Sequence, residues 1–328
     1  IHRVANLMKY GRGSDSDEVP GWVTEDDLAF LEAYAAHPLP DGKPEAERLC
    51  KLEPAMPWSI IAITFTNKAA GELKDRLKAM LGDTVGGDVN ASTFHSACVR
   101  ILRREIERLG YGRSFAIYDT DDSLRVIKGA LKELNIDDKR FAPKGVLSAI
   151  GRAKDELLTP GGYEAGVGDD YYKQVVAKVY AIYQKQLQDA NAVDFDDIIM
   201  LTVRLFKEFP EALDYYRNRF RYIMVDEYQD TNRAQFELVR LLASESGNLC
   251  VVGDDDQSIY KFRGATIENI LQFEDNFPGA KVFRLEQNYR STETILDAAN
   301  AVISNNTERK GKTLWTQNGE GVKVRVHR

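Results

Sequence analysis

The sequence has few cysteines and no long apolar run, and both absences exclude classes of protein. Its three cysteines, at positions 50, 98 and 250, lie far apart without the spacing of a disulfide framework or a zinc site. No apolar stretch approaches the roughly 18–20 residues that span a bilayer, and no charged-then-apolar signal segment opens the sequence. We therefore expect a cytoplasmic protein with reduced thiols and no membrane contact.

An excess of positive charge is also absent. The 328 residues carry a formal net charge of −7, so binding to nucleic acid would require a local basic or aromatic surface. With 43% hydrophobic and 29% charged residues, the chain has the composition of a folded globular protein. Its length predicts two or three domains.

What the sequence does contain is an alternation of apolar strands and helices. The run "IIAITF" at 60–65 is rich in β-branched residues, which is typical of a strand buried on both faces. Further strands are predicted near 89 and at 222–225, 249–252 and 281–285, and helices at 4–8, 69–81, 234–243 and 292–304. From about 111 to 195 apolar residues recur at helical spacing with almost no strand signal. We predict an α/β fold, a parallel sheet with helices on both faces, interrupted by an all-helical insert.

Residues 11–57 do not fit this alternation. Thr24, followed by "EDD", predicts an N-cap and an acidic first turn for a short helix that ends near Ala36. Prolines at 38, 40, 44, 54 and 57 break the chain that follows. We expect a surface insertion, either a solvated loop and helix or an element that binds a partner or regulates.

Polar residues follow four of the predicted strands, at 64–67, 226–227, 253–257 and 287–290. Because ligands bind at the carboxyl ends of parallel strands, we expect these residues to form a site at one edge of the sheet. In nucleotide hydrolysis an aspartate such as Asp226 holds Mg²⁺ through water, and an adjacent glutamate such as Glu227 polarises the attacking water. The alternative is a turn with two exposed acids.

Longer strings extend this pattern to a known family. They are "AITFTNKAAGELKDRL" (62–77), "STFHSACVRILRR" (92–104), "VDFDDIIMLTVRLF" (193–206), "VDEYQDTNRAQ" (225–235), "VVGDDDQSIYKFRGA" (251–265) and "LEQNYRST" (285–292). In this order they resemble the motifs of superfamily 1 DNA helicases of the UvrD/PcrA/Rep family, and within it the UvrD/PcrA branch. The resemblance covers nearly everything outside 11–57.

The resemblance implies a fold and a domain organisation. The fold is a RecA-like P-loop NTPase sheet interrupted by a helical subdomain. The implied domains are motor domain 1A in two parts (1–110, containing the insertion, and 196–284), helical subdomain 1B (111–195) and the start of motor domain 2A (285–328).

The resemblance also implies roles at a nucleotide site, with ATP and Mg²⁺ as cofactors. Asp226 would bind the metal through water, Glu227 would be the general base, and Gln257 would sense the γ-phosphate. Tyr289 would stack on adenine, and Arg290 would contact the γ-phosphate, where an arginine stabilises transition-state charge. Two further residues, Gln229 and Asp230, would organise nucleotide and metal. The alternative for Arg290 is a surface salt bridge.

For single-stranded DNA the resemblance implies aromatic stacking and polar backbone contacts. The candidate aromatic residues are Phe65, Tyr260 and Phe262, each with core packing as the alternative. The candidate polar contacts are Thr64, Thr66, Asn67, Ser92, Thr93, His95 and Arg263. Position 262 departs from the family, which more often has tryptophan there. His95 has no metal-ligand neighbours at the required spacing, so we assign it hydrogen bonding.

The implied function is an ATP-dependent 3′→5′ DNA helicase in DNA repair or replication. Single-stranded DNA and single-strand/duplex junctions are the expected partners, with repair or replication proteins as further partners and a monomer as the expected state. The sequence contains no G-x-x-x-x-G-K-[ST] phosphate loop, so we expect a helicase fragment that is inactive alone. Two alternatives stay open: a catalytically inactive DNA- or protein-binding module, and the helicase part of a recombination nuclease-helicase.

Overall fold

The computed structural model describes residues 1–13, 18–258, 264–306 and 309–325. A four-stranded parallel sheet lies at its centre, in the order β2-β1-β5-β6. The strands are β1 (Ile60–Thr64), β2 (Asn90–Thr93), β5 (Tyr222–Val225) and β6 (Leu249–Val251). Thr64 pairs with Thr93, and Val225 pairs with both Ile63 and Val251, so the strands end nearly level. The predicted parallel sheet is confirmed, and the loops that leave its strands share one edge.

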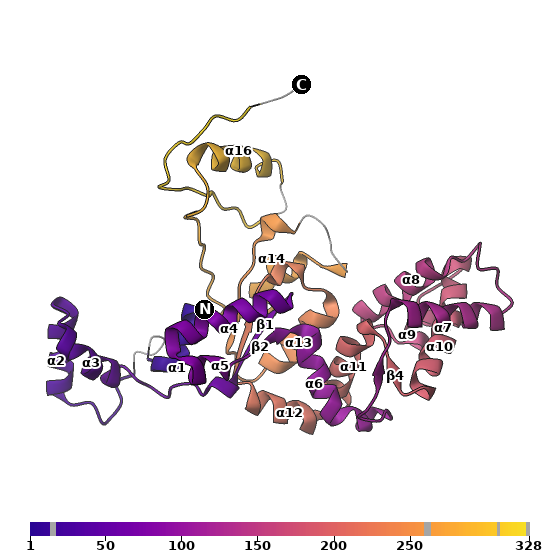
Figure 1. Cartoon of the computed structure of the whole chain (residues 1–328), viewed down its shortest axis with the longest axis horizontal. Helices are drawn as coiled ribbons and strands as arrows, with labels where there is room; N and C mark the ends of the chain where they lie inside the picture. Colours follow the sequence, from indigo (N-terminus) through magenta and orange to yellow (C-terminus); the bar gives the residue numbers. More distant parts are fainter. Residues whose placement is uncertain (14–17, 259–263, 307–308, 326–328) are drawn as a thin grey trace.

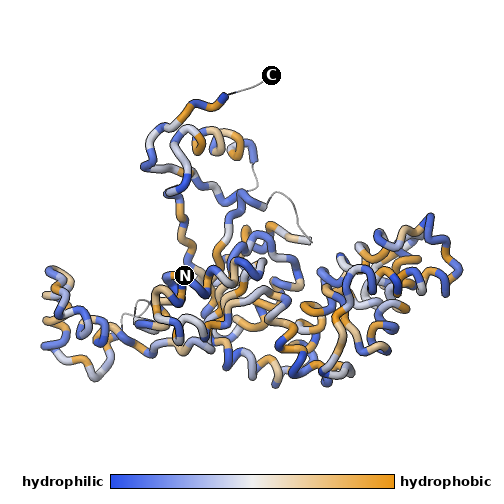
Figure 2. Tube along the Cα trace, viewed as in Figure 1, coloured by the Kyte–Doolittle hydropathy of each residue, from blue (hydrophilic) through white to orange (hydrophobic). Residues whose placement is uncertain are grey.

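Successive residues of β1 face two different apolar clusters, because side chains alternate along a strand. Ile61 and Ile63 pack in the cluster of α6 (Phe94–Glu105), α11 (Phe195–Glu208) and α13 (Arg233–Ala243). Ile60 and Ala62 pack in the cluster of α1 (His2–Tyr10) and α4 (Asn67–Leu81). Helices therefore cover both faces of the sheet, as predicted (Figure 1), and hydrophobic residues recur along the trace of this central region (Figure 2). Each buried aliphatic side chain contributes about 1.5–3 kcal/mol to this packing.

The helical insert has an apolar core of its own. Its helices are α7 (Thr120–Glu133), α8 (Pro143–Asp155), α9 (Pro160–Ala165) and α10 (Tyr171–Asp189). They bury residues such as Ile127, Val146 and Tyr180 in a separate cluster. Where the insert leaves and rejoins the part of the chain that forms the sheet, β3 (Ala116–Ile117) pairs in parallel with β4 (Ala192–Val193). These two-residue strands are too short to give a periodic pattern, and the sequence analysis missed them.

The other helices are short. They are α5 (Asp83–Gly87), α12 (Pro210–Arg219), α14 (Glu268–Leu271), α15 (Phe273–Asn276) and α16 (Glu293–Ile303). Single 3-10 turns occur at Pro40–Gly42, Pro57–Ser59, Ile106–Leu109, Tyr228–Asp230 and Asp255–Gln257. In the part of the chain that the structure describes, no helix combines the length and the apolar character needed to cross a bilayer.

The insertion at 11–57 extends away from the sheet as a small helical block (left in Figure 1). Thr24 and Asp27 form the capping box of α2 (Glu25–Ala36), which confirms the predicted helix. A second helix, α3 (Lys43–Leu49), was missed because Pro44 was interpreted as a breaker. Proline is accepted in a first helical turn, where its absent N–H is not needed.

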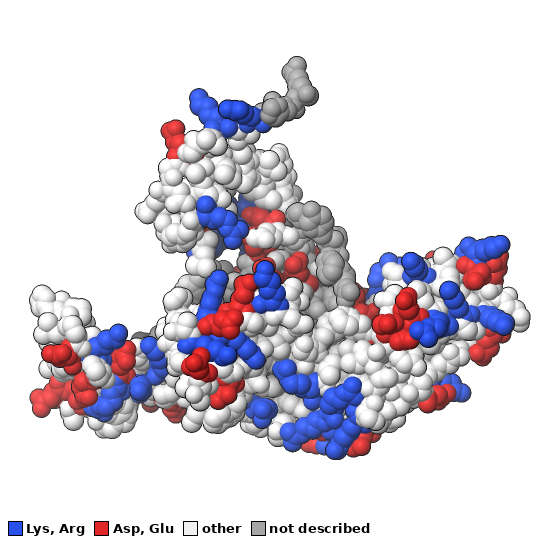
Figure 3. Space-filling view, in the orientation of Figure 1, with Lys and Arg blue, Asp and Glu red and all other residues white. Residues whose placement is uncertain are grey.

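This insertion is the acidic part of the chain. Residues 11–57 contain 11 Asp or Glu and 4 Lys or Arg, which gives a formal charge of −7, equal to that of the whole chain. Figure 3 shows acidic side chains along its outer edge, and α2 buries none of its side chains. The remainder of the chain carries equal numbers of acidic and basic residues, so the insertion accounts for the whole of the net negative charge.

The strand predicted at 281–285 is wrong. Its apolar side chains are exposed, with Phe283 at 80% and Leu285 at 82% relative exposure. A strand needs a neighbouring strand to take its backbone hydrogen bonds, and within the described ranges these residues pair with none. The chain here runs extended toward Gln287, which forms an isolated bridge with Trp315 beside α16.

Candidate nucleotide and nucleic-acid site

The loop after β5 is fixed to the ends of both neighbouring strands. The amide of Asp226 donates to the Ile63 carbonyl (2.9 Å), and the amide of Tyr228 donates to the Val252 carbonyl (2.9 Å). Both carboxylates of the Asp226-Glu227 pair are exposed at this edge of the sheet. Glu227 has a φ of +52°, a left-handed conformation that is uncommon for residues other than glycine. Such strained positions cluster at functional sites.

Gln229 holds the glutamate in place. Its Nε2 donates to Glu227 Oε2 (2.8 Å), and its Oε1 accepts from the Asp254 amide (2.9 Å). The side chain is buried, and a Cβ at Gly253 would lie 2.7 Å from Gln229 Oε1, so only glycine permits this approach. Gln229 therefore links the candidate base to the loop that follows β6. Burial, and next the charge of Glu227, raises the pKa of the nearby Asp230.

The loop after β6 carries a cluster of three aspartates. Asp254, Asp255 and Asp256 lie close enough to hold one metal ion together. However, Lys312 forms ion pairs with all three, at 3.2 Å to Asp255 and 3.3 Å to Asp256. The ammonium already supplies the positive charge, so this cluster is an ion-pair network. Gln257 is exposed and donates to Asp254 Oδ2 (2.7 Å).

The predicted adenine and γ-phosphate contacts lie apart from these loops. Tyr289 is 78% exposed, and its hydroxyl donates to Gln287 Oε1 (2.8 Å). The Arg290 amide donates to Asn288 Oδ1 (2.9 Å), while its exposed guanidinium forms no ion pair with any residue that the structure describes. The structure does not bring either side chain into contact with Asp226 or Glu227 among these residues.

Two clefts open at the carboxyl edge of the sheet, one on each face. The α6/α11 cleft is lined by Thr64, Phe65, Thr93, Phe94, His95, Asp155, Phe195, Asp196, Ile199, Asp230, Asn232 and Gln235. The α1/α4 cleft is lined by Ile1, Arg3, Val4, Ala62, Ile63, Ala69, Glu72, Leu73, Arg76, Met224, Val225, Asp226, Cys250 and Val252. The loop after β5 thus begins in one cleft, at Asp226, and ends in the other, at Asp230 and Asn232.

Several predicted DNA contacts line or border the α6/α11 cleft. Phe65 is half-buried and meets Phe94 edge to face, with ring centroids 5.7 Å apart. Two hydroxyls cap helices, because Thr66 accepts from the Ala69 amide (3.1 Å) and Thr93 accepts from the Ser96 amide (3.2 Å). Of the others, Thr64 donates to the Thr66 carbonyl (3.0 Å), Ser92 is buried and accepts from Arg100 (3.0 Å), and Asn67 is exposed. Tyr260, Phe262 and Arg263 lie outside the described residues.

The sequence analysis missed Phe195, Asp155 and Asp196, which also line this cleft. The ring of Phe195 is 42% exposed and stacks on His95, with centroids 3.6 Å apart and planes 21° from parallel. Phe195 follows Asp194, which caps α11 and shares a capping box with Asp197. An aromatic residue between capping acids, in "VDFDD", is the sequence signal that could have identified it.

Comparison with known proteins places the chain in a family. Residues 46–278 match the family model described as UvrD/REP helicase N-terminal domain, and residues 283–328 match UvrD-like helicase C-terminal domain. The chain belongs to the UvrD/REP helicase family.

Two similar relatives carry the same name. The chain is 57% identical over 272 residues to the ATP-dependent DNA helicase PcrA of Bacillus subtilis (strain 168). The aligned region covers 83% of this chain and 36% of that protein. It is 55% identical over 271 residues to the PcrA of Staphylococcus aureus (strain Mu50 / ATCC 700699), covering 83% and 37%. The chain therefore spans little more than a third of the length of these relatives.

Proposed function

We propose that this chain is part of an ATP-dependent 3′→5′ DNA helicase that acts in DNA repair or replication. The observation that carries this proposal is the loop after β5, which joins the α1/α4 cleft at Asp226 to the α6/α11 cleft at Asn232. A single rigid loop that contacts two clefts can couple a nucleotide in one to DNA in the other. We propose the domains 1–110 with 196–284, 111–195 and 285–328, a monomer, and junction DNA and repair or replication proteins as partners.

In the α6/α11 cleft, Phe65 and Phe195 offer ring faces for bases, and His95 and Thr93 offer polar groups beside them. The acids Asp155, Asp196 and Asp230 line the same cleft and would repel phosphates. Bases rather than backbone should therefore enter it, as in proteins that bind single strands by stacking. We keep Thr64, Thr66, Asn67, Ser92, Tyr260, Phe262 and Arg263 as proposed further contacts.

At the nucleotide site, the exposed Asp226 carboxylate forms no ion pair within the described ranges and suits Mg²⁺, which usually keeps several waters. When bound, the ion would neutralise charge that develops on the phosphates of ATP. Glu227, held by Gln229, would take a proton from the attacking water. Gln257, Tyr289, Arg290 and Asp230 keep their proposed nucleotide roles.

The sequence contains no G-x-x-x-x-G-K-[ST], so it supplies neither the lysine nor the amide cradle for the β- and γ-phosphates. We propose that this chain alone hydrolyses ATP negligibly. Ordinary DNA-stimulated ATP hydrolysis by this exact chain would contradict that statement and leave the DNA-binding proposal untouched.

The test of DNA binding is fluorescence anisotropy with a labelled oligothymidylate of about 16 nucleotides. Phe65→Ala should weaken binding by about tenfold or more, because stacking of a base on an aromatic ring contributes about 1–3 kcal/mol. Phe30→Ala is the matched control, since Phe30 stacks on Tyr34 in the distant insertion. The proposal fails if the unaltered chain does not bind, or if the two variants bind equally well.

A further inference from the structure

Two adjacent residues at the end of α8 connect the helical insert to two different helices of the motor domain. Lys154 Nζ lies 2.7 Å from Asp194 Oδ2 and 2.8 Å from Asp197 Oδ1, both in the first turn of α11. Asn232 is the N-cap residue of α13, and its Nδ2 donates a hydrogen bond to Asp155 Oδ1 (2.6 Å). The last turn of α8 therefore touches the starts of α11 and α13, two of the helices that border the α6/α11 cleft.

The Lys154 contact fixes α11 and the aromatic ring that it carries. The Lys154 side chain is fully buried, and Tyr183 also donates to Asp194 Oδ2 (2.8 Å). Because a buried charge that loses its partner is costly, this joint should not open while the protein is folded. It places Phe195 against His95 on one wall of the cleft.

The Asp155 contact is of a different kind. Asp155 is only half-buried and lines the cleft itself. Its partner Asn232 ends the loop that begins at Asp226, and α13 starts there. A Cβ at Gly264 would lie 3.4 Å from Asp155 Oδ2, so the same carboxylate also lies beside Gly264, four residues before the start of α14. Asp155 thus contacts the cleft, the nucleotide loop and the chain after β6 at once.

We infer that Asp155 is a positioning residue that transmits occupancy of the α6/α11 cleft to the Asp226–Asn232 loop through its hydrogen bond to Asn232. This inference rests on the proposed binding of single-stranded DNA in that cleft. A strand that enters the cleft meets a carboxylate whose helix is held to α11, because the neighbouring Lys154 is locked between Asp194 and Asp197. The hydrogen bond from Asn232 passes the response to the loop that carries Asp226 and Glu227.

The test measures amide hydrogen exchange of this chain with and without saturating oligothymidylate of about 16 nucleotides. The amides of Asp226 and Tyr228 are hydrogen-bonded to neighbouring strands and do not line the α6/α11 cleft, so they report the loop rather than direct contact. DNA should slow their exchange by about tenfold, which corresponds to about 1.4 kcal/mol of local opening free energy. Exchange at 64–67 reports DNA in the cleft.

In Asp155→Ala, DNA should still protect 64–67, but the protection of Asp226 and Tyr228 should disappear. Asp155→Asn keeps an acceptor oxygen and should restore it. Glu156→Ala is the matched control, because Glu156 contacts the neighbouring Arg233 (3.5 Å) at the surface, and it should behave as the unaltered chain.

A second variant approaches the bond from its other side. Asn232→Ser keeps an N-capping oxygen for α13 but is too short to reach Asp155, so it should reproduce the loss even if Asp155→Ala does not fold. Full protection of Asp226 and Tyr228 in either variant would overturn the inference while leaving DNA binding intact. An unaltered chain without protection at 64–67 would overturn the proposed function and the inference together.

Discussion

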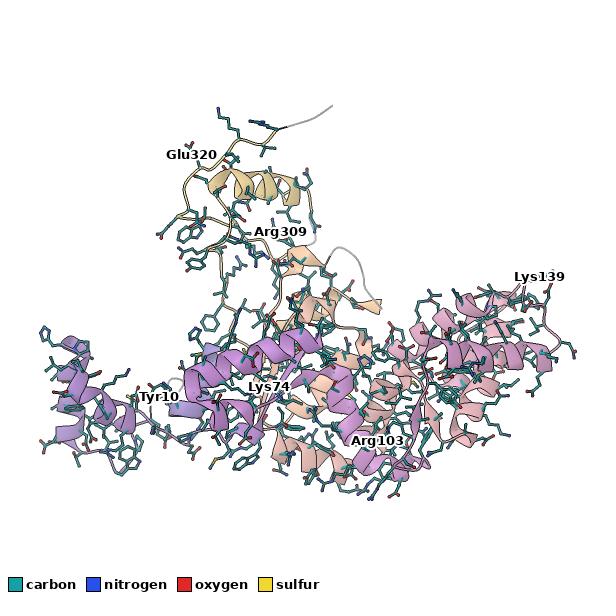
Figure 4. The ribbon with its side chains drawn as sticks, in the orientation of Figure 1. Tyr10, Lys74, Arg103, Lys139, Arg309 and Glu320 are labelled. Atoms are coloured by element: carbon teal, nitrogen blue, oxygen red, sulfur yellow. The ribbon has the colours of Figure 1, made fainter. Side chains whose placement is uncertain are left out.

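Two clusters of opposite charge hold distant parts of this chain together, and they differ mainly in their exposure to water. In the buried cluster, Lys154 pairs with Asp194 and Asp197, and the three side chains are 0%, 6% and 1% exposed. In the partly exposed cluster, Lys312 and Arg309 pair with the aspartates after β6, and Lys312 and Asp255 are 17% and 12% exposed. The labelled Arg309 lies between α16 and the sheet in Figure 4.

This difference in exposure indicates that the contacts of the buried cluster stay formed in the folded protein, whereas those of the partly exposed cluster can open. Burial favours a lower pKa for Lys154, but the charges of Asp194 and Asp197 raise it, so the ammonium stays charged. Burial likewise favours a higher pKa for Asp255, but the Lys310 amide and Lys312 hold it below its ordinary value. In the buried cluster, water cannot replace the partner of a charged group, whereas in the partly exposed cluster it can. We therefore expect the helical insert to stay docked and the segment 309–312 to detach.

The largest expected effect comes from removing the buried ammonium. Lys154→Met should lower the free energy of unfolding by about 3–5 kcal/mol, because Asp194 and Asp197 are left as buried charges without a counter-ion. Urea unfolding followed by circular dichroism, at about pH 7.5, measures this loss. Lys312→Met is the matched control and should cost about 1 kcal/mol or less. Equal losses in the two variants would show that burial does not separate the clusters.

The two aspartates of the buried cluster should respond differently, with a smaller effect than the loss of Lys154. Asp194 accepts from Lys154, Tyr183 and the Asp197 amide. Burial raises its pKa, but the charge and hydrogen bond of Lys154, with the hydrogen bonds from the Asp197 amide and Tyr183, together bring the pKa below its ordinary value. Asp194→Asn should therefore lower the free energy of unfolding at neutral pH by about 1.5–3 kcal/mol, the range for hydrogen bonds to a charged group.

Asp197 should show the opposite dependence on pH. Burial, and next the charge of Asp194, raises its pKa from 3.8 to about 6. The folded protein then binds this proton more tightly than the unfolded chain, so Asp197 lowers stability as pH rises from 3.8 to about 6. Asp197→Asn should remove this slope and cost less at neutral pH than Asp194→Asn. Urea midpoints at about pH 4.5 and 7.5 test both variants. A larger loss of stability at about pH 7.5 in Asp197→Asn than in Asp194→Asn would contradict the opposite pKa shifts of the two aspartates.

The contrast between buried and exposed segments also explains which strands could be predicted from the sequence. β1 and β5 were predicted because β-branched runs are buried on both faces. The strand predicted at 281–285 from Val282, Phe283 and Leu285 failed, since apolar residues in the sequence cannot supply a neighbouring strand. The motif residues that follow β1, β5 and β6 were also predicted, because their placement depends only on where a strand ends.

The residues that the sequence did not reveal depend on the tertiary fold. Asp155 lies 77 positions from its partner Asn232, and Lys154 lies 40 positions from Asp194. No local pattern records such pairs, and a buried lysine at the end of a helix has the same sequence signature as a solvated one. Only docking of α8 onto α11 distinguishes Lys154 from an exposed lysine such as Lys139.

The smallest expected effect concerns the partly exposed cluster. In Asp255→Asn, trypsin should cleave after Lys310 and Lys312 about fivefold faster, because the loss of one partly exposed ion pair contributes about 1 kcal/mol to opening. Asp255 pairs with Lys312 (3.2 Å) and accepts from the Lys310 amide (2.8 Å), so its removal releases the cleavage sites directly. Cleavage after Lys139, at the far end of the helical insert (Figure 4), should not change and calibrates the assay.

Glu274→Gln is the matched control for this prediction. Glu274 pairs with Lys310 (2.7 Å) but is 56% exposed, so its loss should change cleavage by less than about twofold. Salt sharpens the same comparison, because screening shortens the Debye length from about 10 Å at 0.1 M to about 3 Å at 1 M. Added salt should accelerate cleavage at 309–312 in the unaltered chain without lowering the urea midpoint that depends on Lys154. If salt lowered the protection at 309–312 and the urea midpoint equally, water would reach the buried cluster too. The distinction between the two clusters would then fail.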